Sequence, residues 1–349
     1  MIDIATKEGW REHVDIAYER PAPITSQELR ALSFGDRALY NQSRAQYSQA
    51  GAFVRTPQFQ AFQHAVRDRV MLNAYRRVGK LGVILSGEPG QGKTTSLVEV
   101  GRAHERRRRD TGHPSAGPGK IPVVYVAVPA QCSAKALMHE FARFLGLPVL
   151  GRMTYGDLLD TVSNALRRCS TELVLVDDVH HLDLNYRQNI EASDMLKQLS
   201  ERCGGTFVYA GIAVEGTGLL DGERGGQIGK RFEVHVAVPF GLITTEEKAC
   251  WGDLLLAMEN SLCLADHRPG AILPAAATLH ALTGGEIGLL TGLLQFAALR
   301  AMEDGSEKLD LRGFERDVSR RQTAAVLLKT AATLHTQKPR RSRTRAGAK

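Results

Sequence analysis

The sequence predicts an α/β fold in which helices cover both faces of a parallel sheet, followed by a small all-helical region. An apolar run, Leu81 to Leu85, leads into a glycine-rich loop, and a helical stretch over 95–108 follows it. Strand-like and helix-like segments then alternate up to residue 238, as in a sheet whose strands are joined by crossover helices. From residue 244 to about residue 334 the pattern is helical only.

The loop after the first apolar run fits the pattern G-x-x-x-x-G-K-[ST] of phosphate-binding loops. Its glycines let backbone N–H groups turn towards a phosphate, and the next helix adds the partial positive charge of its N-terminus. We expect Lys93 to reach the β- and γ-phosphates of ATP and the Thr94 hydroxyl to ligate Mg²⁺. The predicted nucleotide site consists of Gly87, Glu88, Pro89, Gly90, Gln91, Gly92, Lys93, Thr94 and Thr95.

Two aspartates follow a second apolar run. Leu173 to Val176 reads as a fully buried parallel strand, and Asp177 and Asp178 lie at its carboxyl end, where such sheets bind ligands. We expect Asp177 to hold Mg²⁺ and Asp178 to orient or activate the attacking water. The alternative is a pair of capping aspartates before a helix. Many related ATPases carry Glu at the second position, so the shorter Asp178 predicts slow hydrolysis.

Composition favours a cytoplasmic protein without a membrane span. The 349 residues suffice for two domains, and no apolar run reaches transmembrane length. The charged N-terminus lacks a signal-peptide core. The five cysteines form no C-x-x-C pair and read as reduced thiols, and the adjacent His180 and His181 lack further metal-ligand spacing.

The positive charge is concentrated at the C-terminus. The chain carries a net charge of +7, and residues 338–349 contain six cations and no acid, which leaves the remainder nearly neutral. Such an arm is expected to be disordered when free, and either binds nucleic acid phosphates or only adds solubility. The cations considered for DNA contact here are Arg340, Arg341, Arg343 and Arg345.

Four segments are expected along the chain. Residues 1–55 form a helical extension with helices over 6–18, 25–32 and 33–48, and residues 56–241 form the α/β nucleotide-binding domain. Residues 242–335 form a helical lid, and residues 336–349 a disordered basic tail. Strands are predicted over 81–85, 123–128, 173–176, 206–210 and 234–238, and further helices over 57–75, 134–145, 156–169 and 192–202.

An α/β nucleotide domain followed by a helical lid is the layout of an AAA+ ATPase. Over residues 6 to 330 the chain resembles the TniB family of transposition ATPases, related to TnsC and more distantly to IstB, DnaA and Orc-type proteins. Besides the two nucleotide motifs, the resemblance is carried by Lys7 to Trp10, Val54 to Pro57, Gly101 to Glu105, Ile121 to Val126, Glu140 to Leu147, Phe207 to Ile212 and Gly229 to Phe232.

This resemblance implies an ATP-dependent regulator and not the recombinase itself. Such ATPases assemble on double-stranded DNA as a ring or helical filament and recruit a DDE-type transposase to the target. Arg231 matches the arginine finger that reaches the neighbouring subunit's γ-phosphate, with Arg224 as a second candidate; the alternative for Arg231 is a surface cation. Lys135, Arg152 and Thr154 match the region that faces DNA, although a solvated helix surface explains them equally well.

Two departures from the family pattern leave other functions open. Ile212 stands where a polar sensor 1 residue is common, and Gly288 is followed by Leu289 where sensor 2 has arginine. Hydrolysis is therefore expected to be weak or partner-stimulated. The alternatives are an ATP-binding switch or scaffold that scarcely hydrolyses, a helicase loader of the IstB or DnaC type, and a signalling ATPase that does not bind DNA.

Overall fold

The computed structural model describes residues 2–51, 53–149, 151–182, 188–214, 231–314 and 316. The chain forms two compact units. The first contains Met1–Arg20, Ala50–Pro239 and Glu286–Leu289, and the second contains Pro21–Gln49, Phe240–Gly285 and Leu290–Lys349. The N-terminal segment is therefore divided between the two units. The domain boundaries expected from the sequence, at residues 55, 241 and 335, stay a prediction.

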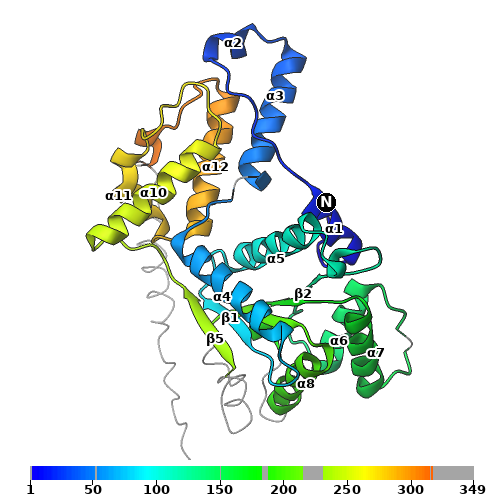
Figure 1. Ribbon diagram of the computed structural model, residues 1–349. Coiled ribbons are helices and arrows are strands. Elements are labelled where there is room, and N and C mark those ends of the chain that lie inside the picture. Colours follow the sequence, from blue (N-terminus) through cyan, green and yellow to red (C-terminus); the bar gives the residue numbers. More distant parts are fainter. Residues whose placement is uncertain are drawn as a thin grey trace, which may run out of the picture. The chain divides into compact units, whose positions relative to one another are not determined.

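The first unit is built on a sheet of five parallel strands, which confirms the predicted fold class (Figure 1). Its order is β2-β3-β4-β1-β5, so the strand before the phosphate-binding loop lies between β4 and β5. Because all strands run the same way, their carboxyl ends meet at one edge of the sheet. The strands are β1 (Gly82–Gly87), β2 (Val123–Ala127), β3 (Leu173–Asp177), β4 (Thr206–Gly211) and β5 (Phe232–Ala237).

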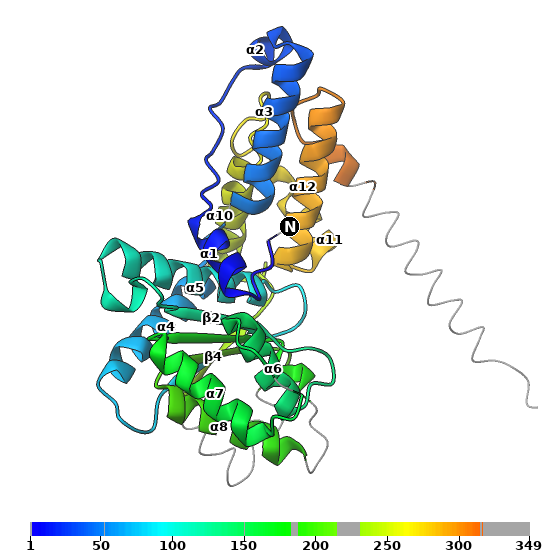
Figure 2. The same cartoon turned by 90° about the vertical axis from the view of Figure 1, so that its right-hand side faces the viewer.

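Helices lie on both faces of this sheet (Figure 2). One layer contains α1 (Lys7–Asp15), α4 (Pro57–Ala74) and α5 (Lys93–Asp110), and the other contains α6 (Ala134–Leu145), α7 (Tyr155–Arg168) and α8 (Gln188–Cys203). Local signals set several helix starts: the hydroxyls of Thr56, Ser133 and Thr154 each accept a backbone N–H in the first turn.

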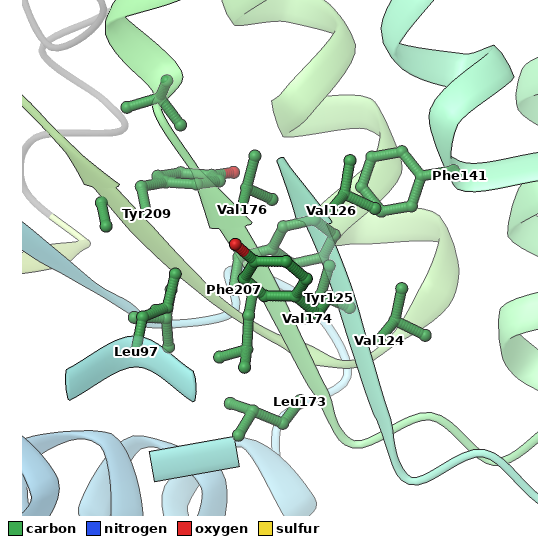
Figure 3. Packing of buried hydrophobic residues seen from close by; sticks show 14 of the residues in the cluster. Leu97, Val124, Tyr125, Val126, Phe141, Leu173, Val174, Val176, Phe207 and Tyr209 are labelled. Atoms are coloured by element: carbon green, nitrogen blue, oxygen red, sulfur yellow. The ribbon is translucent and has the colours of Figure 1, made fainter. Parts of the chain in front are cut away.

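The core of the first unit is formed by the inner strands and the helices that cover them (Figure 3). Trp10 of α1 is 1% exposed, stacks on Tyr125 of β2 with ring centroids 6.0 Å apart, and donates to Glu105 over 2.8 Å. A Cβ atom on Gly101 would lie 2.6 Å from Leu175 and 2.9 Å from Trp10, so glycine is required for this close packing of α5.

The described part of the second unit is helical, in agreement with the predicted C-terminal pattern. A buried ion pair joins its N-terminal and C-terminal parts: Arg44 donates to both carboxylate oxygens of Glu307 over 2.6 and 2.7 Å. Removing either partner would leave a buried charge unpaired, which is strongly destabilising. The helices are α2 (Ser26–Ala31), α3 (Phe34–Gln46), α10 (Thr245–Ser261), α11 (Ala276–Thr283) and α12 (Ile287–Glu303), whose first residues belong to the first unit.

No helix within the described ranges is both long enough and apolar enough to cross a membrane.

Candidate nucleotide site

The glycine-rich loop joins β1 to α5 and has the backbone geometry that phosphate binding needs. Gly90 and Gly92 adopt positive φ angles of 81° and 73°, a region that favours glycine. Gly92 is the N-cap of α5 and, as a glycine, has no side chain that could cap the helix. The N-terminal N–H groups of α5 are therefore aimed out of the helix towards the loop, as an anion site requires.

Lys93 is the first residue of α5 and is largely buried, with 9% of its surface exposed. Its ammonium donates to the backbone carbonyl of Glu88 over 2.7 Å. Burial lowers the pKa of Lys93, and the nearby carboxylates of Asp177, Asp178 and Glu88 oppose that shift. A charge desolvated in this way gains from an anionic partner, and the phosphates of a nucleotide would supply one.

Asp177 ends β3 and is almost fully buried, at 1% exposed. Burial raises the pKa of its carboxyl group, while a hydrogen bond from Thr94, the N–H of Asp178 and the Tyr125 hydroxyl lower it. The Tyr125 hydroxyl donates over 3.1 Å, and the Asp178 N–H over 2.9 Å. The structure thus brings together Thr94 and Asp177, the two residues expected to hold Mg²⁺.

The donor set of this pair fits a magnesium ion. A buried carboxylate beside a threonine hydroxyl offers the hard oxygen ligands that Mg²⁺ prefers, and waters complete its octahedral shell. Among the described residues no cluster of three or more His, Cys, Asp or Glu side chains could hold a metal alone.

Asp178 lies just beyond Asp177 in a left-handed conformation, with a φ angle of 54°. It is the N-cap position of the short 3-10 helix η3 (Val179–His181), but its side chain makes no capping hydrogen bond. The alternative role of a capping aspartate is therefore not realised for Asp178. Its carboxylate is half-buried at the carboxyl edge of the sheet, beside Asp177.

Sequence reasoning did not find the contact between the loop and the start of α12. The N–H of Gly288 donates to the carbonyl of Gly90 over 2.8 Å, and a Cβ atom on Gly288 would meet that same oxygen at 2.8 Å. The Glu286 carboxylate lies close enough that a Cβ atom on Gly90 would be 2.6 Å away. In the sequence, the only trace of this contact is the glycine at position 288.

The structure gives His180 a defined place in η3. Its Nδ1 accepts the backbone N–H of Ile212 over 3.3 Å, which links the end of β3 to the end of β4. Burial lowers the pKa of His180, as does His181, whose ring centroid is 4.2 Å away; the Asp178 and Asp177 carboxylates raise it. Val214, two residues after Ile212, donates its N–H to the buried Ser86 hydroxyl of β1.

Arg231 lies at the amino ends of the parallel strands, whereas the phosphate-binding loop lies at their carboxyl ends. It precedes Phe232, which pairs with Gly82 at the start of β1, whereas the loop follows Gly87 at the end of that strand. Six strand residues span about 17 Å, farther than an arginine side chain reaches. Arg231 also pairs with Glu201 over 3.1 Å, and 34% of its side chain is exposed.

The residues suggested for DNA contact differ in their surroundings. Lys135 on α6 and Arg152 before α7 are exposed. Thr154 is the N-cap of α7, where its hydroxyl accepts the N–H of Asp157 and donates to that carboxylate. Its capping role explains this threonine without DNA. Arg224 and the tail cations Arg340, Arg341, Arg343 and Arg345 lie outside the described residues.

Residues 76–215 match the family described as AAA domain, a span that begins before β1 and ends after β4. The phosphate-binding loop and both aspartates lie within this matched span. A sequence comparison with curated proteins finds no match.

Several solved structures share this fold. The Orc1 protein of Aeropyrum pernix in complex with DNA aligns with a TM-score of 0.55 at 15% identity, covering 81% of this chain and 71% of that one. The ORC2 protein of the same organism in ADPNP–ADP complexes has a TM-score of 0.56 at 16% identity, covering 76% and 67%. Cdc6p of Pyrobaculum aerophilum has a TM-score of 0.54 at 18% identity, covering 78% and 70%.

At these identities the likeness establishes the AAA+ fold alone. The narrower resemblance to TniB and TnsC stays a prediction.

Proposed function

We propose that this protein is an ATP-dependent regulator of DNA transposition. It binds ATP with Mg²⁺, assembles on double-stranded DNA, and recruits or activates a DDE-type transposase at the target. The observation that carries the nucleotide part is the contact of Thr94 with the buried Asp177 beside Lys93. The transposition part rests on the sequence resemblance to the TniB family.

The proposed ATPase reaction divides its tasks among the residues at the carboxyl edge. Lys93 and the loop N–H groups hold the phosphates and offset their charge. Thr94 and Asp177 would hold Mg²⁺, which would supply charge stabilisation when bound. Asp178 accepts a hydrogen bond from the attacking water and orients it. Asp178 has no competing capping bond, which supports this role.

The position of Arg231 supports the proposal of self-assembly. Because the guanidinium is separated from its own loop by the length of β1, it would stabilise charge only on a neighbour's nucleotide. A residue that completes the next subunit's site demands a head-to-tail contact, and repeated head-to-tail contacts build a ring or a helical filament. The pair with Glu201 is partly exposed and is weak enough to exchange for such a contact.

DNA binding is proposed for exposed cations and the basic tail. Lys135 and Arg152 remain candidates on the first unit, while the structure offers Thr154 a local role instead. The six cations of residues 338–349 would contact phosphates without reading sequence.

A second candidate function is an ATP-binding switch that hydrolyses slowly. It is favoured by the apolar side chains of Ile212 and Leu289 at places where related ATPases carry polar groups, and by the short Asp178 carboxylate. In this function ATP binding alone sets the assembled state, and turnover is a property of the partner-bound complex.

Assembly on DNA tests the proposal. The purified chain is mixed at micromolar concentration with unrelated double-stranded DNA fragments and ATP, a non-hydrolysable analogue, or ADP, and particle mass is followed by light scattering and electron microscopy. We expect rings or filaments with ATP and the analogue, and none with ADP. A protein that stays monomeric with ATP and DNA contradicts the proposal.

The genetic neighbourhood separates the DNA-bound alternatives. A DDE-type transposase encoded beside this gene favours transposition, and a replicative helicase gene favours a helicase loader. Assembly that is equally strong without DNA favours a signalling ATPase.

A further inference from the structure

His180 lies close to the proposed nucleotide site, and the proposed reaction assigns it no role. It lies in η3, three residues after Asp177, and its Nδ1 accepts the N–H of Ile212 over 3.3 Å. A backbone N–H can only donate, so Nδ1 carries no proton and the neutral ring is protonated at Nε2. The contact with Ile212 therefore fixes both the orientation of the ring and the nitrogen that donates.

Charged residues of the proposed nucleotide site lie around His180. The ring is half-buried and within electrostatic reach of Lys93, Asp177 and Asp178, the residues that would hold the terminal phosphate, Mg²⁺ and water. No hydrogen bond from Nε2 to another described residue occurs, whereas the neighbouring His181 uses its Nδ1 to contact the Val128 carbonyl. A hydrogen-bond donor in this position complements an anion.

We propose that His180 donates its Nε2–H to the terminal phosphate of ATP and that this contact distinguishes ATP from ADP. The inference rests on the proposed nucleotide site and adds a residue to it. Because the same ring holds the N–H of Ile212, a shift of the imidazole towards the phosphate moves the end of β4. His180 thereby connects the nucleotide state to the backbone at the end of β4.

Three variants of His180 distinguish the role of Nδ1 from that of Nε2. His180→Asn keeps a polar group near the position of Nδ1 and removes the donor at Nε2. His180→Gln places an amide N–H near the position of Nε2. His180→Ala removes both. The dissociation constants of ATP·Mg²⁺ and ADP·Mg²⁺ are measured for each protein by competition with a fluorescent nucleotide, which requires no turnover.

We expect His180→Asn and His180→Ala to weaken ATP binding about tenfold, the effect of one charge-assisted hydrogen bond, with ADP binding unchanged. His180→Gln should recover part of the ATP preference. An unchanged ratio of ATP to ADP affinity in His180→Asn overturns the proposal. So does an equal loss of both nucleotides, because His180 would then only support the fold of the site.

The same binding measurements distinguish a failure of the His180 proposal from a failure of the proposed nucleotide site. A wild-type chain that binds neither nucleotide contradicts the nucleotide site as a whole. A wild-type chain that binds ATP, together with an unaltered His180→Asn variant, contradicts the role of His180 alone.

Discussion

The hydroxyl of Tyr125 donates to a carboxylate oxygen of Asp177 over 3.1 Å, inside the core of the first unit. Tyr125 comes from β2, the strand next to β3, and its ring is stacked on Trp10 of α1. The orientation of the carboxylate proposed to hold Mg²⁺ is therefore coupled to the packing of the N-terminal helix. The stacking of Trp10 on Tyr125 gives this tryptophan a physical role. In the sequence, only the family resemblance pointed to it.

Replacing Tyr125 by Phe removes this hydrogen bond and keeps the ring. We expect the Mg²⁺ concentration for half-maximal ATP hydrolysis to rise about tenfold, because groups that orient a metal ligand typically contribute that much. The matched control is Tyr209→Phe, which alters a buried tyrosine of β4 in the same core. An equal Mg²⁺ requirement in wild type and Tyr125→Phe would show that Asp177 needs no such support.

Asp178 is predicted to orient the attacking water and to contribute little to ATP binding. Asp178→Asn should leave ATP affinity nearly intact and lower turnover about a hundredfold, since the amide is a poor base. Asp178→Glu restores the longer side chain common in related ATPases and should raise turnover. Steady-state phosphate release and nucleotide titration measure the two properties separately. Unchanged turnover in Asp178→Asn would remove this residue from the reaction.

Arg231 is predicted to act on a neighbouring subunit. Arg231→Ala should lower hydrolysis on DNA about a thousandfold, the low end for an arginine finger, with nucleotide binding by the monomer retained. Mixing Arg231→Ala with Lys93→Ala should restore part of the activity, because one variant keeps the site and the other keeps the arginine.

The pair with Glu201 provides the control for Arg231. Glu201→Gln breaks the ion pair and keeps the guanidinium, so its turnover should resemble wild type. If Glu201→Gln is as inactive as Arg231→Ala, or if the mixture shows no recovery, Arg231 has a structural role only.

Glu172 predicts a pH dependence of stability. Burial raises the pKa of its carboxyl, but hydrogen bonds from His104, Arg108 and Ser115 outweigh that effect and bring it from 4.5 to about 2. A lowered carboxyl pKa stabilises the fold above pH 4.5, and this contribution, about 3 kcal/mol, is lost as the pH falls towards 2. Urea unfolding of wild type and Glu172→Gln at pH 7 and at pH 3 measures it.

The difference in unfolding free energy between wild type and Glu172→Gln should shrink as the pH falls. Asp68→Asn, which alters an exposed acid on α4, serves as the control and should show no comparable change. A difference that is the same at pH 7 and pH 3 would contradict the assigned hydrogen bonds.

The sequence predicted the parts of the site that are contiguous in the chain. The phosphate-binding loop and the aspartate pair follow apolar runs, and the parallel sheet brings the ends of such runs to one edge. Tyr125, His180 and Gly288 act through partners 52, 32 and 198 residues away. The spacing of apolar residues within one segment indicates which face of a helix or strand is buried. It contains no information about partners that lie far away in the sequence.

The most direct test of the account is a titration of the wild-type chain and Lys93→Ala with ATP·Mg²⁺. Removing the charge that faces the β- and γ-phosphates should weaken binding about a hundredfold. Lys135→Ala, which removes an exposed cation of α6, should bind ATP as wild type does. Equal ATP affinity in wild type and Lys93→Ala, with both folded by circular dichroism, would contradict the nucleotide site.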